Sequence, residues 1–320
     1  MEHKILAYLE QRPNEYVSGE QLSELLGCTR TAVWKHIRSL RDQGYTFDAV
    51  SRKGYKLTGK PDKLSAAAIL AELSTAVMGR SVKMYDSVDS TQTIAHRLAE
   101  EGAPEGTLVI AEVQTAGRGR MGKNWHSPKG KGVWMSLVLR PNIPVHFTPQ
   151  LTLLVAVALN RTIRKLEPSL PVAIKWPNDL LVDGRKISGI LLESNAEDER
   201  LRHVIAGVGI SVNLQEGDYP EELRGIATSL RMLSGREWSR SELIRAFLEQ
   251  FEALYNLYDS EGFEPIRTAW EASAYSLGRP IAARTPRGVV EGVAESIDEM
   301  GALIVRHPDG SVTKLYSADI

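Results

Sequence analysis

The sequence predicts a multidomain α+β protein, and three observations lead to this fold class. The chain has 320 residues, which is more than one domain usually holds. Helix-like and strand-like segments mix irregularly between residues 65 and 272, which favours a mixed or mainly antiparallel sheet over a doubly wound one. After residue 278 only short strand-like runs remain, separated by turn signals. We therefore predict domains at residues 1–60, 61–272 and 273–320, the last a small β-barrel.

Composition narrows the class of protein. The formal net charge is −1, and no apolar run is long enough to span a bilayer or to act as a signal peptide. The single cysteine, Cys28, excludes an internal disulfide and any cysteine-based metal cage. The seven histidines lack metal-ligand spacing. We expect a cytoplasmic protein without membrane association and without a protein-bound metal site.

The first 60 residues predict a winged helix-turn-helix. A helix over residues 3–11 is followed by a capping box at Ser18, which opens a second helix that ends at Gly27. Thr29 caps a third helix, and residues 45–57 form a two-stranded ribbon with its turn at 51–54. In this arrangement the third helix enters the major groove of DNA and the ribbon touches phosphates.

A mostly cationic face supports this interpretation. The predicted DNA-binding residues lie at the start and on the outer side of the third helix and in the ribbon turn: Thr29, Arg30, Thr31, Lys35, Arg38, Arg52 and Lys53. The alternative is a small packing module with a solvated basic face. The cations are few, so one copy should bind weakly, and useful affinity requires a dimer on a two-fold site.

The middle of the chain supplies the elements of the predicted sheet. Strands are expected at residues 82–85, 107–114, 133–139, 172–176 and 203–214, and a hairpin at 180–193 turns at Gly184. Helices are expected at 63–73, from Ser90 to residue 100, at 148–166 with a cap at Thr148, and from a capping box at Ser239.

Residues 112–139 form the most unusual stretch. Five glycines alternate with five cations, and no carboxylate follows Glu112 until Glu167, so we expect uncompensated positive charge. The spacing matches both the dinucleotide fingerprint and the start of a P-loop, but each requires a helix directly afterwards, and here a strand follows. A cationic strand–loop–strand suits a phosphate or carboxylate ligand. The alternative is a solvated surface loop.

Three other polar groups are candidates for a site. Ser90 and Thr91 precede a helix, where hydroxyls act as caps or bind a neutral ligand group. Asn178 and Asp179 occupy a turn after a strand, and Lys186 lies in the hairpin. The alternatives are an ordinary turn and a surface lysine.

Together these residues resemble the biotin protein ligases. The resemblance is carried by S-T-Q at 90–92, Q-T-A-G-R-G-R-M-G at 114–122, Trp125, K-W-P-N-D-L at 175–180 and K-I-S-G-I-L-L-E at 186–193. With the winged helix in front, the chain resembles the bifunctional type, in which the biotin operon repressor is also biotin–[acetyl-CoA-carboxylase] ligase. The resemblance implies a biotin/lipoate-ligase-like central domain and an SH3-like C-terminal barrel.

The resemblance also implies an activity and a site. Such enzymes use ATP and Mg²⁺ to form biotinyl-5′-adenylate and pass biotin to a lysine of biotin carboxyl carrier protein. By this resemblance the catalytic residues are Lys186, Arg118 and Arg120. Biotin would contact Ser90, Thr91, Gln92, Gln114, Arg118, Gly119, Arg120, Trp125 and Lys186, and ATP would contact Lys123, Asn178, Asp179 and Asn213.

Two positions depart from the family pattern, and three alternatives stay open. Gln92 stands where many members have Asn, and Ser211 stands where Asn is usual, so a role for Ser211 with ATP does not carry over.

The chain could be a sensor without ligase activity, a ligase that does not bind DNA, or a lipoate ligase. We further expect the adenylate-bound protein to dimerise on operator DNA, with the adenylate as corepressor.

Overall fold

The computed structural model describes residues 1–320 apart from 43–44, 51–52, 60–63 and 198–199. These residues form two compact units, Met1–Lys63 and Leu64–Ile320. The third predicted domain, 273–320, therefore lies within the same compact unit as the central sheet. Among the described residues, no helix has the length and apolar character that crossing a membrane requires.

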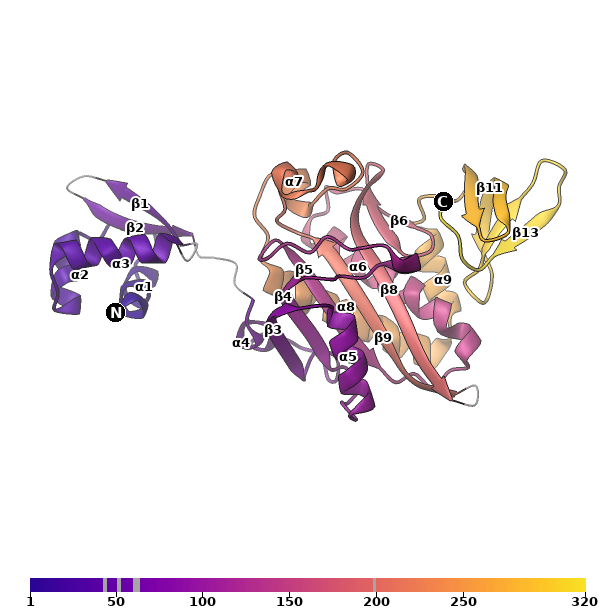
Figure 1. The fold of residues 1–320 in the computed structure, drawn as a ribbon, viewed down its shortest axis with the longest axis horizontal. Coiled ribbons are helices and arrows are strands. Elements are labelled where there is room, and N and C mark those ends of the chain that lie inside the picture. Colours follow the sequence, from indigo (N-terminus) through magenta and orange to yellow (C-terminus); the bar gives the residue numbers. More distant parts are fainter. Residues whose placement is uncertain (43–44, 51–52, 60–63, 198–199) are drawn as a thin grey trace. The chain divides into compact units, whose positions relative to one another are not determined.

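The first unit has the predicted helix-turn-helix with a ribbon (Figure 1). Its elements are α1 (Glu2–Glu10), α2 (Gly19–Leu26), α3 (Arg30–Asp42) and the antiparallel strands β1 (Thr46–Val50) and β2 (Gly54–Gly59). The Ser18 capping box forms, Gly27 ends α2 at φ 61°, and Thr29 Oγ1 accepts from Ala32 N at 3.2 Å. Buried side chains of all three helices form the core, among them Ile5, Leu22, Val33, Ile37 and Leu40.

The second unit is built on a seven-stranded mixed sheet with the order β3-β4-β5-β9-β8-β7-β6. Only the pair β3–β4 is parallel, and the other neighbours are antiparallel, which confirms the predicted α+β class. The strands are β3 (Val82–Val88), β4 (Leu108–Gln114), β5 (Gly132–Leu139), β6 (Val172–Lys175), β7 (Asp179–Val182), β8 (Arg185–Glu197) and β9 (Arg200–Ser211).

Helices cover both faces of this sheet because its central strands are buried on both sides. On β4, Leu108 and Ile110 join the main core with α6 (Thr148–Leu166) and α8 (Arg240–Glu261), whereas Val109 packs with α5 (Thr91–Glu100). Figure 1 shows α5 in front of the sheet and α6, α8 and α9 (Glu264–Glu271) behind it. The short helices α4 (Ala66–Leu70) and α7 (Leu230–Ser234) lie outside these layers.

Some predicted boundaries are wrong. The helix predicted over residues 63–73, with its start near Ser65, is the shorter α4: Ser65 caps it as predicted, but it ends at Leu70. Thr148 does not cap α6, because its Oγ1 donates to Val145 O at 2.6 Å. The strand predicted over residues 203–214 is β9, which begins at Arg200 and ends at Ser211, opposite the first residue of β5. The predictions for Arg52 and for the domain boundary at residues 60–61 fall outside the described residues.

The C-terminal segment is a four-stranded antiparallel sheet. Strands β10 (Pro280–Thr285), β11 (Gly288–Ile297), β12 (Leu303–Arg306) and β13 (Val312–Leu315) follow one another in order. After β13, Asp319 pairs with Arg284 of β10, which brings the end of the chain back to the first strand. This return curls the sheet toward the predicted barrel.

Candidate active site

A cavity of about 290 Å³ lies between the glycine-rich loop and one face of the central sheet. Its floor includes Gly189 of β8 and Gly207 and Gly209 of β9. A Cβ at Gly207 would lie 2.5 Å from Oε1 of Gln92, and one at Gly209 would collide with the Trp125 ring. The strand glycines are therefore required because two other side chains lie directly over the backbone.

One end of the cavity is a network of neutral polar groups. Thr91 Oγ1 lies 3.1 Å from Gln114 Oε1 and 2.9 Å from Ser136 Oγ, which donates to Gln92 Oε1 at 3.0 Å. Gln92 Nε2 donates to Leu191 O and Ile205 O. Ser90 caps α5. The three residues of the S-T-Q motif and Ser136 are all buried. Such a fixed set of donors and acceptors suits a neutral polar ligand.

Trp125 covers the apolar middle of the cavity. Its ring lies against Gly189 and Gly209, and Lys186 Nζ is 5.1 Å from the ring centroid. Within the described chain, the buried indole Nε1 has no hydrogen-bond partner. An orphaned buried donor of this kind is costly unless a ligand or water meets it.

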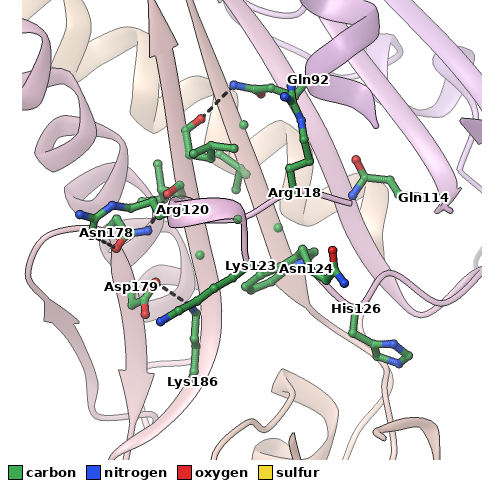
Figure 2. A pocket seen from close by; sticks show the side chains of 18 of the residues that line it. Gln92, Gln114, Arg118, Arg120, Lys123, Asn124, His126, Asn178, Asp179 and Lys186 are labelled. Atoms are coloured by element: carbon green, nitrogen blue, oxygen red, sulfur yellow. Dashed lines mark hydrogen bonds and ion pairs between the residues drawn. The ribbon is translucent and has the colours of Figure 1, made fainter. Parts of the chain in front are cut away.

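The other end of the cavity gathers charged groups (Figure 2). Lys186 Nζ lies 2.7 Å from Asp179 Oδ1, an ionic contact without good hydrogen-bond alignment. Arg120 donates to Asn178 Oδ1 at 3.1 Å and to Ser317 Oγ at 2.7 Å. Burial lowers the pKa of Arg120, although Asp179 and Asp319 oppose this shift. Arg120 still carries its charge, because a guanidinium stays protonated in proteins.

The expectation of uncompensated charge on the loop is wrong. Carboxylates from distant parts of the chain pair with four of its five cations, as Arg118–Glu193, Lys123–Asp319, Lys129–Asp86 and Lys131–Asp218. Three of these four carboxylates follow their partner cations by 75 residues or more in the sequence. Counting charges along the chain could not reveal them, because only the folded sheet brings them close.

The structure brings together all but one of the ligand residues expected in the second unit. Those lining the cavity are Ser90, Thr91, Gln92, Gln114, Arg118, Gly119, Arg120, Lys123, Trp125, Asn178, Asp179 and Lys186. Asn213 is not among them. It is buried, and its amide exchanges two hydrogen bonds with the backbone of Trp238. Its side chain therefore fixes a turn behind the cavity wall.

Sequence reasoning missed several lining residues. Ser136 is one residue of an apolar strand, and Asp319 lies next to the end of the chain. Nothing local marks either as functional. Lys123, followed by a smaller contribution from Lys175 and Arg120, lowers the pKa of Asp319, with burial acting in the opposite direction. His126 and Tyr219 also line the cavity, and burial raises the pKa of Tyr219. Ser211, which the sequence analysis named without assigning it a role, lines the cavity as well.

The described residues contain no group of three His, Cys, Asp or Glu side chains that could hold a metal ion. In the first unit, all described residues of the predicted DNA face are exposed: Thr29 before α3, Arg30, Thr31, Lys35 and Arg38 on α3, and Lys53 in the ribbon turn. Sequence analysis missed Trp34, which is 49 % exposed on the same helix beside Arg38.

Comparison with known proteins agrees with this geometry. The chain matches the Biotin/lipoate A/B protein ligase family over residues 84–211, an HTH domain over 2–56, and the Biotin protein ligase C terminal domain over 276–320. The structure of the Aquifex aeolicus biotin protein ligase in complex with biotin and ATP is similar, with a TM-score of 0.64 and 28% identity over 74% of this chain and 96% of that chain. The fold and the cavity thus define a biotin protein ligase.

Full-length relatives specify the type. The bifunctional ligase/repressor BirA of Bacillus subtilis is 49% identical over 99% of this chain and 97% of its own length. The BirA of Escherichia coli is 32% identical over 99% of this chain and 95% of its own length. A biotin–[acetyl-CoA-carboxylase] ligase of Paracoccus denitrificans is 36% identical over 71% of this chain. This chain belongs to the family of bifunctional ligase/repressors.

Proposed function

We propose that this chain joins biotin to ATP, forming biotinyl-5′-adenylate and pyrophosphate, and then transfers biotin to a lysine of biotin carboxyl carrier protein. The observation that carries the proposal is the division of one cavity into a neutral polar end, an aromatic middle and a charged end. Biotin has the same three parts: a neutral ureido group, an apolar ring and chain, and a carboxylate.

The neutral end binds the ureido group in this proposal. Ser90, Thr91, Gln92 and Gln114 offer donors and acceptors that are already held in place by hydrogen bonds among themselves and to the backbone. A preorganised site loses little side-chain entropy on binding. Trp125 covers the thiophane and valeryl region, and its buried Nε1 has no hydrogen-bond partner among the described residues.

The charged end carries out adenylation. A carboxylate oxygen of biotin attacks the α-phosphorus of ATP, the bond to the β-phosphate oxygen breaks, and pyrophosphate leaves. Lys186, Arg118 and Arg120, with the backbone of Gly119, hold the two anions together and offset their repulsion. Lys123, Asn178 and Asp179 contact the nucleotide. Asn213 supports this wall through the backbone of Trp238.

Magnesium enters with the nucleotide in this scheme. The ion usually takes one or two carboxylates together with phosphate oxygens and water. Asp179 and Asp319 both line the charged end, so the donor set fits an ion that ATP carries. When bound, the ion would shield the phosphate charge.

Transfer follows at the carboxyl carbon of biotin, which adenylation has activated. The acceptor lysine amine attacks the mixed anhydride, an amide bond forms, and AMP leaves with its phosphate oxygen. Until then the loop must keep water and other amines away from the anhydride. Replacing Arg120 by Gly removes its bonds to Asn178 and Ser317. Arg120→Gly should therefore release adenylate faster and biotinylate bystander proteins, and unchanged release contradicts this role.

The first unit makes the protein a biotin-responsive repressor in the cytoplasm. The α3 face with Arg30, Lys35 and Arg38 contacts operator DNA, and biotinyl-5′-adenylate acts as corepressor by favouring a homodimer. Sedimentation with and without adenylate tests the dimer. A monomer under both conditions contradicts this part of the proposal.

The ligase is tested by incubating the full chain with ATP, Mg²⁺, biotin and a carrier-domain fragment, followed by intact mass. The expected result is a biotin-sized mass gain on the carrier that Lys186→Ala abolishes. Lys35→Ala serves as the matched control, because this exposed lysine lies in the first unit. No mass gain with the wild-type chain would sink the ligase assignment.

A further inference from the structure

Arg118 does not lie with the other cations of the charged end. Its guanidinium donates to Glu193 Oε2 at 3.1 Å. Figure 2 shows the side chain extending toward Gln92, away from Lys186 and Asp179. For Arg118 to hold the carboxylate and phosphate, the guanidinium must leave Glu193.

Glu193 is itself fixed by a second donor. His96 Nε2 lies 3.3 Å from the same Glu193 Oε2, and His96 Nδ1 lies 3.3 Å from His203 Nε2. A carboxylate only accepts, so His96 donates through Nε2 and its Nδ1 accepts from His203. The chain of bonds thus runs from a buried histidine to the carboxylate that holds Arg118.

The order of the elements explains why these groups meet. Gln92 and His96 are four residues apart on α5 and face the same strands. Gln92 donates to the backbone of Leu191 on β8 and of Ile205 on β9. One turn along α5, His96 contacts the side chains of Glu193 and His203. Each lies two residues from the strand residue that Gln92 contacts, in the same spatial direction because β8 and β9 are antiparallel. Side chains two apart on a strand share a face. The network is therefore a continuation of the neutral end of the cavity.

We propose that Glu193 is a positioning residue that competes with the ligand anions for Arg118. In the ligand-free protein it neutralises Arg118 and keeps the loop folded. When adenylate binds, its phosphate replaces Glu193 as the partner of Arg118. The inference rests on the proposed function, since it deepens the role of Arg118 there.

The Glu193→Gln variant should bind adenylate more tightly, whereas damage to the fold would weaken binding. Glu193→Gln removes the competing charge and keeps the shape of the side chain. The pair is partly exposed, with 45 % of the Arg118 side chain and 33 % of that of Glu193 accessible. Exposed ion pairs are worth up to ~1 kcal/mol, so adenylate should bind about twofold to fivefold more tightly.

The experiment measures the dissociation of biotinyl-5′-adenylate from the full chain by stopped-flow tryptophan fluorescence. Glu193→Gln should slow dissociation, and the same change added to Arg118→Gln should have no further effect, because the competition acts through Arg118. Glu197→Gln is the matched control, since Glu197 lies on the same strand but pairs with Arg202.

Unchanged or faster dissociation in Glu193→Gln overturns the inference, and so does equal slowing in the Arg118→Gln background. A wild-type chain that does not bind adenylate overturns the proposed function itself. The two failures are therefore distinguishable.

Discussion

Arg240 Nη1 lies 2.7 Å from Glu112 Oε2, and the same nitrogen donates to Gly132 O at 3.3 Å. Glu112 is on the strand that enters the glycine-rich loop, and Gly132 begins the strand that leaves it. One buried guanidinium on the first turn of α8 thus fixes both stems of the loop. Arg240 Nη2 and Leu64 N both donate to Glu112 Oε1 and satisfy the carboxylate further.

Breaking this pair should destabilise the protein strongly. The side chains of Arg240 and Glu112 are 1 % and 10 % exposed. Removing one partner leaves a buried charge, which costs roughly 3–5 kcal/mol. We expect Glu112→Ala to lower the free energy of unfolding by about 3 kcal/mol in denaturant titrations followed by circular dichroism. The double variant Glu112→Leu with Arg240→Met should regain most of this loss, and a double variant no more stable than the single one would contradict the explanation.

Gly207→Ala should weaken biotin binding without unfolding the sheet. An added Cβ would lie 2.5 Å from Gln92 Oε1 and must displace that amide. Losing its hydrogen bonds should weaken biotin binding about tenfold in calorimetry. Gly217→Ala is the control, because nothing lies within 4 Å of a Cβ there. Equal affinities of the two variants would count against the role of Gln92.

Stability should fall in mild acid because of His203. Burial, then the nearby His96, Arg140 and Arg202, lower its pKa below the ordinary value of 6.5, while Glu100 acts in the opposite direction. Below pH 6.5 the unfolded chain therefore binds more protons at this histidine than the folded chain does. The contribution of neutral His203 to stability is fully present above pH 6.5 and is lost as the pH falls toward the pKa of the folded state. His203→Gln should make the melting temperature less dependent on pH in thermal melts. The control His146→Gln, at an exposed histidine, should leave the pH dependence unchanged.

The α3 face should show two kinds of contribution to DNA binding. Lys35→Ala and Arg38→Ala should each lower the slope of log affinity against log salt by roughly 0.9, if each contacts one phosphate. Trp34 carries no charge, so Trp34→Ala should weaken binding and leave the slope unchanged. Fluorescence anisotropy with an operator duplex selected from a random pool measures both. A reduced salt slope for Trp34→Ala would contradict the distinction between charged and uncharged contacts.

Much of the fold could be predicted from local patterns. The Ser18 capping box, the stop at Gly27 and the cap at Thr29 predicted the winged helix, because capping interactions act over a few residues. The glycine-rich stretch predicted a strand–loop–strand, and the structure confirms it between β4 and β5. Boundaries such as that at Thr148 were wrong where a hydroxyl found a different backbone partner.

The sequence by itself determined the chemistry that is available: neutral groups at 90–92, cations among glycines, and Lys186 in a hairpin. Only the tertiary structure decided how these groups are paired. Glu193, Asp319 and Arg240 lie 75, 196 and 128 residues from their partners Arg118, Lys123 and Glu112. The reason is physical: side-chain pairing depends on distances of a few ångström, and the packing of strands, helices and loops, rather than position along the chain, sets those distances.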